Sequence, residues 1–238
     1  MRLRVHPMRP ADVNHCAALA ALVPEELRRY GSLFEKLPSA WLKVIRQGSL
    51  NSSVIEDVEG RSTNVVAWGA SVFVTDSFLR SFKAAPLRWI APELTRLVLE
   101  GRAPILSPEE IRRANSTDGL NNVVWGGLGI APNPGEQTLL NLEILRAFER
   151  DHLGYRFKEL IFQPAALEPI HMSLKWGGRF WSAEDAEYLA PATLPTEEQV
   201  RQPFLMGFTR GSAQEEAGSW ASPVRQSSSR SQPETSGE

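Results

Sequence analysis

The stretch from Asn121 to Trp181 constrains the fold most, because strand-like and helix-like segments alternate along it. An apolar run at 121–129 is followed by a helix start at 133–136, where Asn caps the helix, Pro takes its first position and Glu its third. Apolar residues at helical spacing continue to a glycine at 154, and an apolar strand follows at 157–163. Strands and helices that alternate at this spacing predict a mixed α/β sheet covered by helices.

The N-terminal half adds a first strand at 3–5, two helical regions within 10–47, and a strand pair at 54–58 and 65–74. The segment 76–121 that follows is helical and strongly apolar, with a capping box starting at Ser107. Because this segment is strongly apolar, it must pack on the sheet or on a partner. It is expected either to wall a substrate cleft or to form a homodimer surface.

The last 28 residues differ in composition from the rest of the chain. Eight of them are serine, and the bulky apolar ones are Trp220 and Val224. Such a segment cannot bury enough surface to offset its ordering entropy. We therefore expect one domain at 1–210 and a disordered tail at 211–238.

Charge and cysteine content exclude several classes of partner. The net charge is −2, and the tail carries the whole excess, which leaves 24 basic and 24 acidic residues in 1–210. A neutral domain has no bulk field to attract nucleic acid or an anionic membrane. Cys16 is the single cysteine, so no internal disulfide or cysteine zinc cluster can form. His6 and His15 show no metal-ligand spacing, so no metal site is expected, and the chain is predicted to be cytoplasmic.

Several short segments, taken in order, resemble the GNAT superfamily of N-acetyltransferases. They are Arg-Pro-Ala-Asp at 9–12, Gly-Leu-Gly-Ile-Ala-Pro at 127–132, Gly-Tyr at 154–155 before an apolar strand, and the helix exit at 174–180. The resemblance implies a GNAT-like acyl-CoA N-acyltransferase fold, with 76–121 as a helical insertion between its third and fourth strands. It also implies transfer of an acyl group from acyl-CoA to a small-molecule or peptide amine.

The resemblance places the cofactor, acetyl-CoA or another acyl-CoA, at the end of the fourth strand and at the helix after it. Gly129 and Ile130 end that strand, and the amides of Gly135, Glu136 and Gln137 would bind the pyrophosphate. The family's glycine-rich loop is absent: the prolines at 132 and 134 have no N–H, and the Glu136 carboxylate would repel phosphate. A capped structural helix is the alternative interpretation.

Three residues are candidates for proton transfer. Glu56, in the centre of an apolar strand, is the candidate general base, although it would also suit a solvated strand face. Ser173 stands where the family often places a tyrosine acid, and His171 lies two residues earlier. A surface position on the helix is the alternative for His171.

The sequence also fits a second class of function, a non-catalytic one. The segments at 71–78, 105–111, 114–115 and 119–121 resemble an uncharacterised bacterial group with this domain, some members of which carry a LuxR-type helix-turn-helix at the C-terminus. The chain would then be a non-catalytic sensory or regulatory domain lacking that module, or a domain that binds an acyl signal in the same cleft without transfer.

Overall fold

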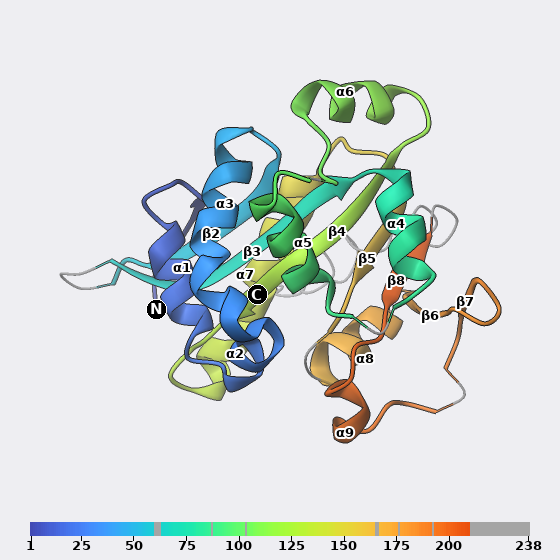
Figure 1. The fold of residues 1–238 in the computed structure, drawn as a ribbon. Coiled ribbons are helices and arrows are strands. Elements are labelled where there is room, and N and C mark those ends of the chain that lie inside the picture. Colours follow the sequence, from blue (N-terminus) through green and yellow to red (C-terminus); the bar gives the residue numbers. More distant parts are fainter. Residues whose placement is uncertain are drawn as a thin grey trace, which may run out of the picture.

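A computed structural model describes residues 1–59, 63–86, 88–102, 104–164, 167–175, 177–191 and 193–209. Within these residues one mixed sheet runs in the order β1-β2-β3-β4-β5-β8-β6-β7 (Figure 1). Only β4 and β5 pair in parallel; the other neighbours are antiparallel. The strands are β1 Leu3–Pro7, β2 Leu50–Asp57, β3 Asn64–Val74, β4 Leu120–Gly129, β5 Phe157–Phe162, β6 Arg179–Ser182, β7 Glu187–Leu189 and β8 Met206–Thr209.

Helices cover both faces of this sheet (Figure 1). Helices α1, α3 and α5 pack on one face, and α7 packs on the other. The described helices are α1 Val13–Ala20, α2 Pro24–Tyr30, the 3-10 helix η1 Gly31–Lys36, α3 Leu37–Arg46, α4 Asp76–Lys83, α5 Ile90–Leu99, α6 Pro108–Ser116, α7 Pro134–His152, α8 Leu167–Lys175 and α9 Glu197–Val200. Among the described residues, no helix is long and apolar enough to span a membrane.

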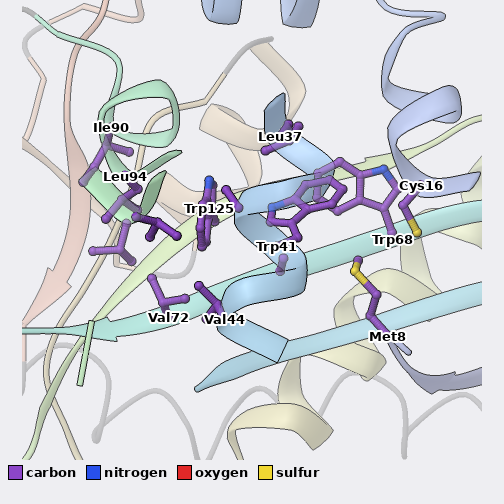
Figure 2. Close-up of a cluster of buried hydrophobic side chains, with 14 of the residues drawn as sticks. Met8, Cys16, Leu37, Trp41, Val44, Trp68, Val72, Ile90, Leu94 and Trp125 are labelled. Atoms are coloured by element: carbon purple, nitrogen blue, oxygen red, sulfur yellow. The ribbon is translucent and has the colours of Figure 1, made fainter. Parts of the chain in front are cut away.

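The largest hydrophobic cluster lies between the sheet and α1, α3 and α5. Figure 2 shows three tryptophans within it, Trp41 from α3, Trp68 from β3 and Trp125 from β4. The rings of Trp41 and Trp68 meet edge to face at 4.7 Å between centroids. Ile90 and Leu94 of α5 join the same cluster, so the apolar side of the insertion is part of the core.

The predicted α/β fold with a helical insertion is confirmed. Helices α4, α5 and α6 lie between β3 and β4, and the capping box at Ser107 forms as predicted. The first strand, the strand pair β2 and β3, and the strand-helix-strand unit after Leu120 follow one another in the predicted order. A homodimer surface on the insertion stays a prediction.

Two details differ from what local sequence rules favour. A strand that ends the strand-helix alternation, as β6 does, would be expected at the edge of the sheet, but β8 lies between β5 and β6 and leaves β7 at the edge. A proline such as Pro10 often stands in the first turn of a helix, but Pro10 lies in a turn, and α1 begins at Val13. The predicted disordered tail lies outside the described residues.

Candidate functional site

The candidate site is a pocket where β4 and β5 separate. The two strands pair only from Leu120 to Val123, whereas β4 continues to Gly129. Trp125 is an extra residue in β4, because Ser71 pairs with Val124 and Ala70 with Gly126, and such a bulge bends a strand. A pocket of about 830 Å³ lies beside this separation.

The pocket is lined from both faces of the sheet. On one side it is lined by α2 and the start of α5, and on the other by α7 from Gln137 to His152. Residues of β4 from Val124 to Gly129 form its central wall. The pocket therefore borders both faces of the sheet beside the gap between the strands.

The edge of β4 that faces this gap is partly open. The Ile130 N–H donates to the Val66 carbonyl, so by antiparallel alternation the polar groups of Gly129 and Gly127 point away from β3. The Gln137 side chain accepts from the Ala131 N–H at 2.9 Å and donates to the Gly129 carbonyl at 3.1 Å. The open part of the edge therefore centres on Gly127.

Beneath α7 the pocket becomes polar. Ser53 of β2 donates to the Asp151 carboxylate at 2.7 Å, and the Ser71 hydroxyl of β3 lies 2.8 Å from His152 Nε2. Asn51 lies directly beside Ser71 in the β2–β3 register, and its buried Nδ2 has no acceptor in the part of the chain that the structure describes. All five residues line the pocket, so its α7 side offers donors, a carboxylate and an imidazole.

Burial shifts the pKa of both titratable groups on α7. It raises the pKa of Asp151, against the hydrogen bond from Ser53 and the charge of Arg150. No ion pair formed within the described residues involves Asp151. Burial lowers the pKa of His152 to about 4, although its hydrogen bond to the Phe148 carbonyl acts the other way. Asp151 therefore has no cationic partner among the described residues, and His152 is uncharged at neutral pH.

The α2 side carries a compensated pair of charges. Arg29 Nη1 donates to Glu26 at 3.2 Å, and Nη2 donates to the Pro164 carbonyl at 3.1 Å. The Arg29 guanidinium also lies 3.9 Å from the centre of the Trp89 ring. Burial raises the pKa of Glu26, and Arg29 opposes this shift. Since Glu26 already has a cation, it is a weaker candidate than Asp151 for binding an amine.

Only three of the residues predicted from sequence line the pocket. They are Gly129, Gln137 and Ser173, and the buried Ser173 hydroxyl has no hydrogen-bond partner within the described segments. His171 is exposed on α8 and does not line the pocket. Ile130 bonds to β3, and Gly135 and Glu136 also lie outside the lining.

The N-terminus of α7 does not fit the diphosphate of a coenzyme A nucleotide. The Glu136 N–H donates to Asn133 Oδ1 at 3.0 Å, and the Gln137 N–H donates to the Asn133 carbonyl at 2.9 Å. Pro134 has no N–H, and the Glu136 carboxylate adds negative charge at this end. Of the three amides predicted to bind phosphate, only that of Gly135 has no acceptor among the described residues.

Glu56 does not reach the pocket. Its carboxylate forms an ion pair with Arg4 and lies 3.3 Å from His6 Nε2, because β1 pairs with β2 and brings Arg4 opposite Glu56. His6, Asp12 and Glu56 together lie close enough to share a metal ion. The two carboxylates are neutralised by Arg4 and by Arg9, so this geometry does not support Glu56 as a base or the trio as a metal centre.

Sequence reasoning missed the polar group under α7. One signal was available: Asn51, Ser52 and Ser53 are consecutive polar residues within a largely buried strand. A second signal was the pair Asp151-His152 at the end of a helix. Nothing in the local sequence, however, connects these two places.

No protein-family profile and no curated protein matches the chain. Similar solved structures include an uncharacterized protein from Bacillus halodurans, with 10% identity and a TM-score of 0.46 over 92% of this chain and 89% of that one. The loading GNATL domain of CurA from Lyngbya majuscula has 13% identity and a TM-score of 0.46, over 89% of this chain and 99% of that one. Mutant forms of the spermidine/spermine N-acetyltransferase SpeG from Vibrio cholerae have 12% sequence identity and a TM-score of 0.46, over 90% of this chain and 98% of that one. These likenesses assign no site residue.

Proposed function

We propose that the protein is an N-acyltransferase, which transfers an acyl group from a thioester to an amine in the pocket beside β4. The observation that carries this proposal is Asp151, a carboxylate without a cationic partner on the wall of a largely apolar pocket. A partly buried carboxylate without a counter-charge is a strong site for an ammonium group. The GNAT-like order of elements supports the same reaction class.

In this proposal the edge of β4 binds the thioester, and Asp151 on the α7 side binds the amine. A bound acyl thioester supplies an activated carbonyl carbon. The open edge of β4 at Gly127 can pair with amides of an extended thioester arm, as a strand edge pairs with a peptide. Asp151 would hold the amine as its ammonium and accept a proton from it, and Ser53 fixes the orientation of the carboxylate.

In this proposal the protein does not bind the acyl donor through the donor's nucleotide. The α7 N-terminus does not fit a diphosphate, because Asn133 accepts from the Glu136 and Gln137 N–H groups. Recognition would therefore rest on the acyl chain and the thioester arm. Acyl-pantetheine thioesters should bind about as well as the matching acyl-CoA.

Calorimetric titration with acetyl-, octanoyl- and palmitoyl-CoA and with the matching acyl-pantetheines tests the donor. Amide formation with spermidine, agmatine and octylamine, followed by mass spectrometry, tests the reaction. Asp151→Asn should lower amide formation at least 100-fold, the scale of a lost general base. Glu149→Gln, the same change at an exposed position of α7, should leave it unchanged. The absence of amide with every donor and amine, or unchanged turnover in Asp151→Asn, refutes the proposal.

One observation favours the sensory alternative. The self-capped start of α7 is what a domain that never handles a nucleotide would have. Binding of an acyl compound in the pocket with no amide product would support a non-catalytic ligand-binding domain instead. A relation to LuxR-type regulators, a cytoplasmic location and a homodimer stay predictions.

A further inference from the structure

Ser71, His152 and Asn51 form a second group on the same pocket wall, which the proposed transfer does not use. The Ser71 hydroxyl donates to His152 Nε2 at 2.8 Å, and His152 Nδ1 donates to the Phe148 carbonyl at 2.7 Å. This second bond fixes the tautomer that leaves a lone pair on Nε2. Nucleophile, base and orienting acceptor therefore follow one another, which is the arrangement that activates a hydroxyl.

Asn51 adds a free donor beside the hydroxyl. It pairs with Ser71 across β2 and β3, so the two side chains project from the same face. Directly paired residues have Cβ atoms about 5 Å apart. The Asn51 Nδ2 is buried without a protein acceptor and lines the pocket, so it is placed to donate to an oxygen that gains negative charge near Ser71.

We propose that Ser71 is a nucleophile that accepts the acyl group from an activated ester or thioester and forms an acyl-serine. Ser71 Oγ forms a bond to the carbonyl carbon while its proton passes to His152 Nε2. The bond from that carbon to the leaving group then breaks, and the leaving thiolate or alkoxide takes the proton from His152. Asn51 Nδ2 donates to the carbonyl oxygen while it carries the negative charge.

The acyl-serine is then discharged by an amine or by water. The incoming N–H or O–H loses its proton to His152 Nε2, its heavy atom bonds to the carbonyl carbon, and Ser71 Oγ leaves and recovers the proton. Donor and acceptor would thus occupy the pocket in turn. This route agrees with the missing diphosphate site, because the donor needs to be held only until its acyl group has moved.

The inference deepens the proposed function, but it can be tested without an amine. The full chain is mixed with p-nitrophenyl octanoate or octanoyl-pantetheine and quenched in acid. Intact mass spectrometry should show one octanoyl group, and peptide mapping should place it on Ser71. Ser71→Ala should lose the adduct and lower p-nitrophenol release at least 100-fold. Ser52→Ala, a buried serine on the opposite face of β2 that does not line the pocket, should keep both.

Ser71→Cys keeps the size of the side chain and provides a nucleophile if Ser71→Ala fails to fold. It should form a thioester adduct that hydroxylamine removes. His152→Gln should slow adduct formation at least 100-fold with a circular dichroism spectrum like that of the wild type. Absence of any adduct, an adduct on another residue, or wild-type adduct formation by Ser71→Ala overturns the inference. If amide still forms in Ser71→Ala without an adduct, the proposed function stands and this inference falls.

Discussion

Acidification should destabilise the fold through His152. The imidazole is 7% exposed, and burial lowers its pKa to about 4. The folded-state pKa lies below the unfolded-state value, so the stabilising contribution is present above about pH 6.5 and is lost as the pH falls through about 4. With these two values, protonation removes about 2 kcal/mol of unfolding free energy between pH 7 and pH 5, and about 3 kcal/mol by pH 4.

Urea unfolding at pH 7 and pH 5, followed by tryptophan fluorescence, measures this effect in the wild type and in His152→Gln. The loss on acidification should be about 2 kcal/mol larger in the wild type, because carboxylates such as Asp12 and Asp76 titrate alike in both proteins. His171→Gln, the same change at an exposed histidine, should retain the wild-type loss. A difference between wild type and His152→Gln below about 0.5 kcal/mol would refute the reasoning.

Four further substitutions test the site and the packing around it. Asp151→Asn should raise the unfolding free energy at neutral pH while it lowers activity. Burial raises the pKa of Asp151, so its negative charge costs stability once the pH exceeds that pKa. An unchanged urea midpoint would contradict this. Gly126→Ala would place Cβ 2.6 Å from the Trp68 ring and should cost about 1–3 kcal/mol. Gly127→Ala meets nothing nearer than 3.6 Å and should change stability by less than about 0.5 kcal/mol, so equal costs at both positions would refute the packing argument. Ser107→Ala removes the α6 cap and should cost about 1 kcal/mol in thermal or urea unfolding, and no loss would show that the cap does not hold the helix.

Features that depend on a few consecutive residues were predictable. The Asn133 and Ser107 caps lie within four residues of the groups they bind, and both form as predicted. The helices of the insertion and the strand-helix-strand order after Leu120 follow from apolar spacing alone. Gly129, Gln137 and Ser173 also reach the pocket, because their places at the ends of elements are set by those local patterns.

The sequence by itself therefore determined the class of fold, the caps and the helical insertion, since these follow from short-range spacing. The tertiary structure alone decided what surrounds each polar side chain. Pairing of β1 with β2 brings Arg4 to Glu56 and removes the predicted base from consideration, while packing of α7 on β3 brings His152 to Ser71, 81 positions earlier. These contacts depend on strand register and helix docking, which a sequence pattern does not encode locally, and they decide where the chemistry of the pocket lies.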